Sequence, residues 1–166
     1  MPTVRPASTA DLATIRELAY RIWPVAYSSI LSPEQLQYML ERFYALPSLA
    51  EQMGANHRFL LLEDGGIPQG FASYSPAEAP GQWKLQKLYV LPGQQGKGLG
   101  RTLLQVVESA IREVGASALI LNVNRHNPAL NFYEKLGFRI AREEDISIGE
   151  GYFMNDYVLE KHIEAE

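Results

Sequence analysis

The stretch that decides the fold is Gln95-Gly-Lys-Gly-Leu-Gly100, which lies between an apolar run at 85–91 and an apolar-periodic run at 99–114. The first run is typical of a strand and the second of a helix, so the sequence predicts a strand, a glycine-rich turn and a helix. Such a turn can hold a phosphate, because backbone N–H groups and the helix start both favour an anion. Glycine there permits a positive φ and a close approach of the ligand to the backbone.

Two familiar phosphate motifs do not fit this stretch. A P-loop needs Ser or Thr after its lysine, but Gly98 follows Lys97. The dinucleotide fingerprint needs a third glycine or alanine, and the corresponding positions hold Arg101 or Leu103. What remains is Gln95-x-x-Gly98-x-Gly100 followed by Arg101. The alternative interpretation is a glycine-rich turn before a core helix, with no ligand.

A second motif lies at 127–138, after a strand-like run at 118–123, and reads Asn127-x-x-x-x-Phe132-Tyr133-x-x-x-Gly137-Phe138. In order and spacing the two motifs resemble the acetyl-CoA-binding segments of the GCN5-related N-acetyltransferases, the GNAT superfamily. They cover roughly the C-terminal half of the chain. The segment at 30–39 resembles, more loosely, the PaiA-like branch that acetylates polyamines.

The resemblance implies the GNAT fold, an α/β (mixed α+β) architecture. Its central sheet is mixed, mostly antiparallel and twisted, with six to seven strands and helices on both faces. Residues 1–166 are expected to form a single N-acetyltransferase domain, since this length supports one core. Along the chain we predict strands at 4–6, 59–62, 67–75, 82–91, 118–123, 138–148 and 152–160.

Local signals place the helices. Ser8 and Ser32 look like N-cap residues of helices. Ser32 is followed by Pro33 at the first helical position and by Gln35, whose side chain could donate a hydrogen bond back to the cap residue. Pro24 is expected to kink or end the first helix. Ser48 predicts the start of a third helix that ends near Gly54, and two further helices are predicted at 98–114 and 128–136.

Composition excludes several classes of function. The formal net charge is −4 with no long basic tract, which disfavours nucleic-acid binding. No apolar run approaches the ~18 residues of a membrane span, so no membrane partner is expected. The absence of cysteine rules out disulfides, Cys nucleophiles and Cys-ligated metals, and no metal site is predicted. We expect a cytoplasmic protein.

The resemblance implies acetyl-CoA, or coenzyme A, as the cofactor. Its pyrophosphate would lie on the backbone N–H groups of the 95–101 loop, and the pantetheine arm would pair with the main chain of the preceding strand, which splays from its neighbour. Asn127, and more weakly Asn131, would lie beside the pantetheine. The implied cofactor-binding residues are Leu88, Tyr89, Val90, Gln95, Gly96, Lys97, Gly98, Leu99, Gly100, Arg101, Asn127, Asn131 and Tyr133.

The family's reaction moves an acetyl group to an amine, and Tyr133 matches the tyrosine that protonates the leaving thiolate. A phenol of pKa ~10 can serve a thiol of pKa ~8.5 if the site balances the difference. The alternative is a packing aromatic beside Phe132. No base is assigned: no carboxylate lies at 83–91, and Glu78, Glu150, Asp156, His57 and His126 are not distinguished from ordinary polar residues.

The expected acceptor is a small amine or polyamine, which attacks directly in a ternary complex. Trp23, Tyr27 and Tyr74 could line its site through cation–π contacts. The open alternatives are a protein N-terminus or lysine as acceptor, and a non-catalytic acyl-CoA-binding regulatory module. A homodimer is expected only because dimers are common in the family.

Overall fold

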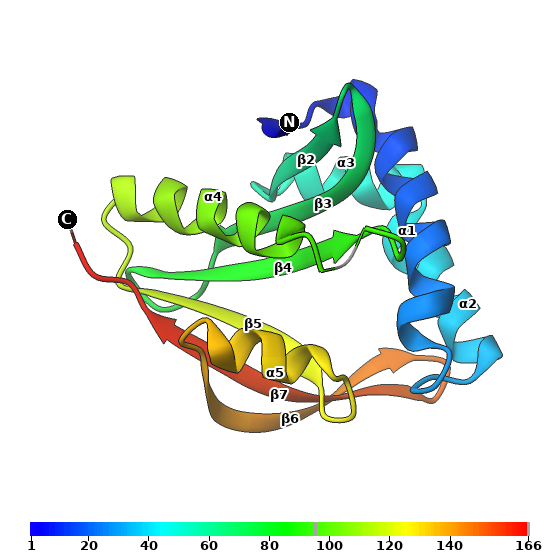
Figure 1. The fold of residues 1–166 in the computed structure, drawn as a ribbon. Coiled ribbons are helices and arrows are strands. Elements are labelled where there is room, and N and C mark those ends of the chain that lie inside the picture. The colour runs from blue at the N-terminus through cyan, green and yellow to red at the C-terminus, as the bar shows by residue number, and fades with distance from the viewer. Residues whose placement is uncertain (95, 166) are drawn as a thin grey trace.

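The computed structural model describes residues 1–94 and 96–165, so Gln95 of the predicted loop lies outside the described residues. The described chain contains a seven-stranded sheet. Its strands are β1 (Pro2–Pro6), β2 (Arg58–Asp64), β3 (Ile67–Pro76), β4 (Gln82–Val90), β5 (Ala118–Asn124), β6 (Arg139–Gly149) and β7 (Tyr152–His162). Their order is β1-β2-β3-β4-β5-β7-β6, and only β4 and β5 pair in parallel (Figure 1). The predicted mixed, mostly antiparallel sheet is confirmed.

Helices cover both faces of the sheet, as predicted. They are α1 (Leu12–Tyr27), α2 (Pro33–Tyr44), α3 (Leu46–Gly54), α4 (Leu99–Glu113) and α5 (Ala129–Lys135). One core lies between the sheet and α4 with α5, and a second lies between the opposite face and α1 to α3 (Figure 1). Within the described residues, no helix is long and apolar enough to cross a membrane.

The start of α1 follows its predicted signal, but its end does not. Ser8 and Asp11 form a reciprocal capping box around the short 3₁₀ turn η1 (Thr9–Asp11) that leads into α1. The helix then continues through Pro24 to Tyr27, so it does not end at the proline. Pro24 lies on the exposed face, where water can satisfy the carbonyl that loses its partner, while Trp23 stays buried on the inner face.

The next two helices begin with different chemistry. Ser32 caps α2 by accepting a hydrogen bond from the backbone N–H of Gln35 at 3.1 Å, as predicted. The Gln35 side chain does not return to the cap, because its Nε2 donates to the carbonyl oxygen of Phe153 at 2.9 Å. The predicted Ser48 start of α3 is wrong: the helix begins at Leu46, with a proline in its first turn and no side-chain cap.

The feature that positions the site is the separation of β4 from β5. These strands pair only from Gln82 and Ala118 to Leu85 and Leu121, and residues 87–90 are paired on the β3 side alone. The β3–β4 register also shifts after Ser73, which makes Gln86 the extra residue of a β-bulge. In Figure 1 the two strands diverge toward α1. Alternate N–H and C=O groups at 87–90 therefore face away from β3 without a strand partner.

Candidate active site

The predicted phosphate loop ends at the first turn of α4. Gly96 and Gly98 have φ of +84° and +74°, and a Cβ at either would meet no atom within 4 Å. The glycines are therefore set by backbone conformation rather than by packing. The first intrahelical bond joins the N–H of Thr102 to the carbonyl of Gly98 at 3.0 Å. The preceding N–H groups of the turn are the ones left free for an anion.

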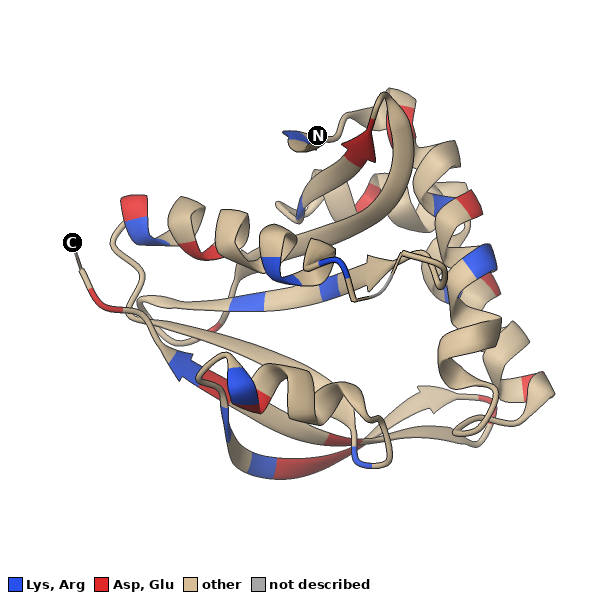
Figure 2. Cartoon of the chain, viewed as in Figure 1, with Lys and Arg blue, Asp and Glu red and all other residues tan. Residues whose placement is uncertain are grey.

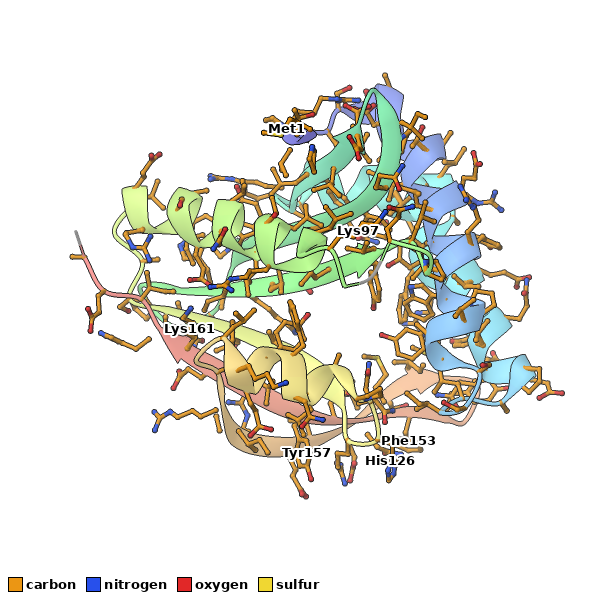
Figure 3. The ribbon with its side chains drawn as sticks, in the orientation of Figure 1. Met1, Lys97, His126, Phe153, Tyr157 and Lys161 are labelled. Carbon is orange, nitrogen blue, oxygen red and sulfur yellow. The ribbon has the colours of Figure 1, made fainter. Side chains whose placement is uncertain are left out.

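Two basic side chains accompany this turn. Lys97 extends from the loop, where its Nζ donates to Oε1 of Gln94 at 2.9 Å, and Arg101 is exposed in the first turn of α4 (Figure 3). Cations at a helix N-terminus oppose the helix dipole. Binding of an anion at the start of α4 would account for Lys97 and Arg101 at this position. Along the rest of α4 both signs of charge occur, whereas β4 carries lysines and no acidic residue (Figure 2).

The two sequence motifs meet at Gly100. A Cβ at this position would lie 3.4 Å from Cζ of Phe132 in α5, so glycine allows α4 and α5 to come together. Gly100 was predicted as part of the phosphate cradle, and the structure adds this packing role. It places the loop and Tyr133 on the same side of the sheet.

The predicted asparagines occupy different environments. Oδ1 of Asn127 accepts a hydrogen bond from the N–H of Ala129 at 2.8 Å, so this side chain supports the start of α5. Asn131 is exposed on α5. The strand residues Leu88 and Val90 face the α4 core, whereas Tyr89 faces the α1 core.

Tyr133 is 8% exposed and packs edge-on against Phe132 and Phe138, with ring centroids 5.1 and 5.5 Å apart. Burial raises its pKa, and the nearby Tyr27 raises it further. The phenol therefore stays protonated at neutral pH, which is the form that a proton donor needs. Tyr133 belongs to the α4 core, whereas Tyr27 belongs to the α1 core on the opposite face of the sheet.

An aromatic cluster stands on that opposite face. The hydroxyls of Tyr27 and Tyr89 lie 2.9 Å apart, and Trp23 packs against both rings at 4.7 and 5.8 Å. The structure thus brings together the predicted Trp23 and Tyr27. It does not bring Tyr74 to them: Tyr74 is buried in the α4 core against Trp83, with centroids 5.9 Å apart. We therefore remove Tyr74 from the acceptor site.

Asp156, which the sequence did not distinguish from an ordinary polar residue, shares the face of Tyr27. On β7, Met154 packs into the α1 core, so strand alternation places Asp156 on the same face. Asp156 pairs in register with Asn124 of β5, and its Oδ2 accepts a hydrogen bond from Nδ2 of Asn122 at 3.2 Å. This juxtaposition depends on the β5–β7 register. The sequence signal for this site was that polar residues, Asn122 and Asn124 on β5 and Asp156 on β7, interrupt two otherwise apolar strands.

Lysines flank the same face along β4. Nζ of Lys87 donates to Oε1 of Gln52 at 2.7 Å and lies over the rings of Tyr44 and Phe59. Burial lowers the pKa of Lys87 to about 8. Burial also lowers the pKa of His57, and the positive charge of Lys87 lowers it further. His126 is exposed at the outer edge of the molecule, beyond β5 (Figure 3).

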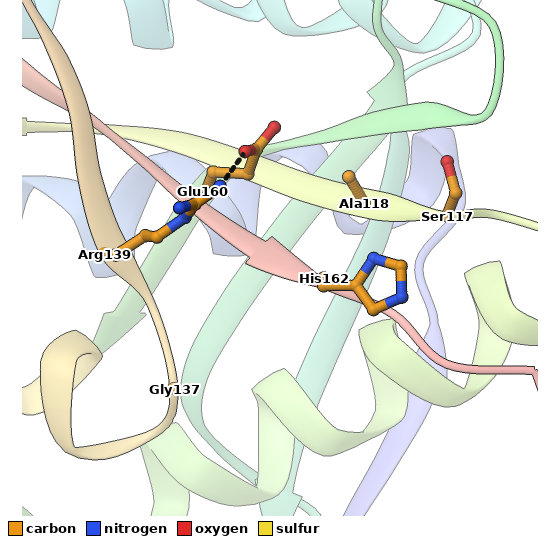
Figure 4. Close-up of a pocket in the computed structure, with 6 residues that line it drawn as sticks. All are labelled: Ser117, Ala118, Gly137, Arg139, Glu160 and His162. Atoms are coloured by element: carbon orange, nitrogen blue, oxygen red, sulfur yellow. Dashed lines mark hydrogen bonds and ion pairs between the residues drawn. The ribbon is translucent and has the colours of Figure 1, made fainter.

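Two surface recesses lie away from the diverging strands. One is at the paired end of β5 and contains the Arg139–Glu160 contact of 3.4 Å (Figure 4). Its lining residues are Ser117, Ala118, Gly137, Arg139, Glu160 and His162. The other lies between α4 and α5, where Arg101 and Lys135 contribute to its wall. Neither contains Tyr133 or Asp156.

The described residues fit acetyl-CoA and offer no metal site. The glycine turn has free N–H groups and open space above it, and residues 87–90 have unpaired backbone groups beside the divergence. Among the described residues, no group of three or more His, Asp or Glu side chains could hold a metal ion.

Comparisons with known proteins agree with this geometry. The acetyltransferase (GNAT) family profile matches residues 12–138. An uncharacterized N-acetyltransferase of Mycobacterium tuberculosis is 29% identical over 156 residues, covering 92% of this chain and 98% of that protein. The spermidine N(1)-acetyltransferase of Thermoplasma acidophilum is 26% identical over 168 residues, covering 98% of each.

A solved structure is similar over the whole chain. The PaiA N-acetyltransferase of Thermoplasma acidophilum, in complex with coenzyme A, has a TM-score of 0.82 and 25% identity, and the match covers 98% of this chain and 99% of that one. The family profile spans well over half of the 166 residues. The chain therefore belongs to the acetyltransferase (GNAT) family, whose members take their acetyl group from acetyl-CoA.

Proposed function

We propose that this acetyltransferase acts on the primary amine of a small amine or polyamine, by direct attack in a ternary complex. The observation that carries the proposal is the divergence of β4 from β5. The glycine turn lies beyond the end of β4, Tyr133 approaches the divergence from the α4 face, and an aromatic and acidic cluster faces it from the α1 side. Two reactants can therefore meet from opposite faces of the sheet.

Residues of the glycine turn and of β4 would hold the cofactor along the divergence between β4 and β5. The N–H groups of Gly96 to Arg101 would bind the pyrophosphate, with Lys97 and Arg101 adding charge. The unpaired backbone groups at 88–90 would bind the pantetheine as a further strand would. The recess between α4 and α5, with Arg101 and Lys135 on its wall, would suit the phosphate-bearing nucleotide end. Acetyl-CoA supplies the activated acetyl group as a thioester.

Tyr133 is the proposed proton donor to the leaving sulfur. Burial raises its pKa, and Tyr27 raises it further, so it keeps its proton at neutral pH. This rise widens the difference from a thiol of pKa ~8.5, so the transfer requires that burial also raise the basicity of the leaving thiolate. Phe132 and Phe138 fix the ring, which limits the motion needed for proton transfer.

A cationic acceptor suits the α1 face. Trp23, Tyr27 and Tyr89 offer aromatic surface to an ammonium group, and Asp156 offers a negative charge. The Thermoplasma relative that is named a spermidine acetyltransferase supports this class. A relative in Escherichia coli, 29% identical over 85% of this chain, is named an L-amino acid N-acyltransferase, so amino acids belong in any acceptor panel.

The test is acetylation of an acceptor panel, followed by mass spectrometry of the products. The panel contains spermidine, L-amino acids, and a peptide with a free N-terminus and a lysine. We expect acetylspermidine, and a Tyr133→Phe rate lower by about 10²- to 10⁴-fold with CoA affinity within a few-fold of the parent. Tyr20→Phe, on α1, is the matched control.

Other outcomes would identify the alternatives. Acetylated peptide without acetylspermidine would indicate a protein acceptor. Tight CoA binding without transfer to any amine would indicate a regulatory module. An undiminished rate for Tyr133→Phe would show that this tyrosine is not the proton donor.

A further inference from the structure

Asp156 is a buried carboxylate that the fold does not explain. It is 3% exposed, and its neighbour on β7, Tyr157, packs against the α4 core on the other face of the sheet. Ion pairs elsewhere on this part of the sheet involve other acids: Arg125 pairs with Glu143 and Asp145 and touches only the backbone carbonyl of Asp156. Within the described residues, no cation lies at ion-pairing distance from the Asp156 carboxylate. A buried charge without such a partner is costly to keep.

The surroundings leave one oxygen of this carboxylate available. Oδ2 accepts the Asn122 hydrogen bond, whereas Oδ1 has no hydrogen-bond partner among the described residues. Burial raises the pKa of Asp156, and Glu144 of β6 raises it further, while Asn122, Lys84 of β4 and Arg125 oppose the rise. The negative charge also reaches Tyr27 of α1, whose pKa it raises in addition to the effect of burial. Because Met154, two residues earlier on β7, packs into the core that contains Tyr27, strand alternation places Asp156 on the face of the aromatic cluster.

We propose that Asp156, held by Asn122, receives the ammonium group of the acceptor and accepts its proton. The inference rests on the proposed function and deepens it by naming the base. An ammonium over Oδ1 would lie among Tyr27, Tyr89 and Asn122 of β5, on the α1 side of the divergence. It would supply the missing counter-charge of the buried carboxylate. The acceptor must therefore be a cation before it reacts.

The proton steps balance as follows. One N–H bond of the ammonium breaks, its proton forms an O–H bond on Asp156, and the neutral amine keeps the electron pair. The amine attacks the thioester carbon, so a C–N bond forms and the C–S bond breaks. The sulfur takes the phenolic proton of Tyr133. The second proton lost from nitrogen restores that phenol through solvent, and Asp156 releases its proton to water.

The arrangement separates the two proton carriers. Tyr133 belongs to the α4 core and Asp156 to the α1 face, so the acid and the base approach the divergence from opposite sides of the sheet. Direct proton exchange between them is thereby hindered. A raised pKa also makes Asp156 a stronger base than an exposed aspartate, which helps it to deprotonate an amine of pKa ~10.

The experiment compares the full-length parent, Asp156→Asn, Asp156→Glu and the control Asp64→Asn, which lies at the β2–β3 turn. We measure kcat/KM for spermidine from pH 6 to pH 10, the rate with an aromatic amine that is neutral at pH 7, and spermidine binding to the CoA complex by calorimetry. Thermal unfolding monitors the fold. Asp156→Asn should keep its melting temperature, because it removes a buried charge that burial disfavours.

We expect Asp156→Asn to lower kcat/KM by about 100-fold at pH 7, with the deficit shrinking toward pH 10 as spermidine loses its protons in solution. The aromatic amine should react nearly normally, spermidine should bind at least tenfold more weakly, and Asp156→Glu should retain more activity than Asp156→Asn. A deficit equal at all pH values and for both amines would overturn the proposal, as would parent-like activity of Asp156→Asn. If the parent acetylates no amine, it is the proposed function that fails.

If Asp156→Asn does not fold, Asp156→Glu carries the test. Loss of the spermidine rate in a folded Asp156→Glu with an unchanged aromatic-amine rate would support the proposal. Equal loss with both amines would contradict it.

Discussion

At the scale of single residues, Gly70 of β3 shows how closely that strand approaches β4, the strand proposed to bind the cofactor. A Cβ there would lie 2.5 Å from the carbonyl oxygen of Tyr89 and 3.2 Å from Cα of Val90. Both contacts are with backbone, so a side chain could be accommodated only by moving the strand. The close approach of the two backbones explains why a glycine stands inside this strand.

We therefore expect Gly70→Ala to destabilise the protein by about 1–3 kcal/mol, as overpacking does. It should also weaken CoA binding, because it displaces the backbone proposed to hold the pantetheine. Urea unfolding and calorimetric titration with CoA would measure the two effects. Gly93→Ala is the control, since a Cβ there meets nothing within 4 Å. Equal behaviour of the two variants would contradict the close-approach argument.

At the scale of elements, α4 is tied to the sheet by an ion pair. Nζ of Lys161 on β7 lies 2.9 Å from Oε1 of Glu108, and both side chains are mostly buried (Figure 3). Lys161→Met would leave a buried carboxylate without its partner and should cost about 1–3 kcal/mol. The double variant Glu108→Gln/Lys161→Met should recover most of that loss in chemical unfolding. A double variant as unstable as the single one would show that packing, not charge, holds α4.

The buried Lys87 of β4 should make the stability of the protein depend on pH. Burial lowers the pKa of Lys87 from 10.5 to about 8. Between these values the unfolded chain binds more protons than the folded one, so this group makes stability rise as the pH increases from about 8 to 10. Lys87→Met should flatten that rise, whereas Lys135→Met, at an exposed position of α5, should not. Unfolding curves across this pH range would show the difference.

Local signals in the sequence predicted the elements well where the chemistry is local. The Ser32 cap of α2 and the strand that begins at Ile67 are as predicted. The helix α1 does not end at Pro24, because Trp23 is buried and Tyr27 packs against the same core, and this packing outweighs the expected break. The bulge at Gln86, and the face of the sheet on which Tyr74 lies, depend on how β3 and β4 pair. The hydrophobic periodicity of each strand alone does not reveal this register.

At the scale of the whole molecule, the candidate site is assembled from segments far apart in the chain. Tyr27 comes from α1, Tyr133 from α5 and Asp156 from β7. The cofactor side proposed here could be derived from the two motifs, because each motif is contiguous, and its residues stay a prediction. The acceptor side was predicted only in part, since the position of Asp156 follows from the β5–β7 register.

If residues 1–166 form a single domain, as predicted, thermal unfolding should be one cooperative transition. CoA at 100 times its Kd should then stabilise the whole molecule by about 2.7 kcal/mol, because it binds only the folded state. Scanning calorimetry with and without CoA would test this. Two transitions, of which CoA shifts only one, would contradict the single-domain prediction. Sedimentation of the same sample would test the predicted homodimer.

The central claim is that the cofactor lies in the divergence between β4 and β5. A crystal structure of the complex with CoA tests it most directly. We predict the pyrophosphate on the N–H groups of Gly96 to Arg101, the pantetheine along residues 88–90, and the sulfur near the hydroxyl of Tyr133. A complex with CoA bound elsewhere, or with its sulfur out of reach of Tyr133, would contradict the account.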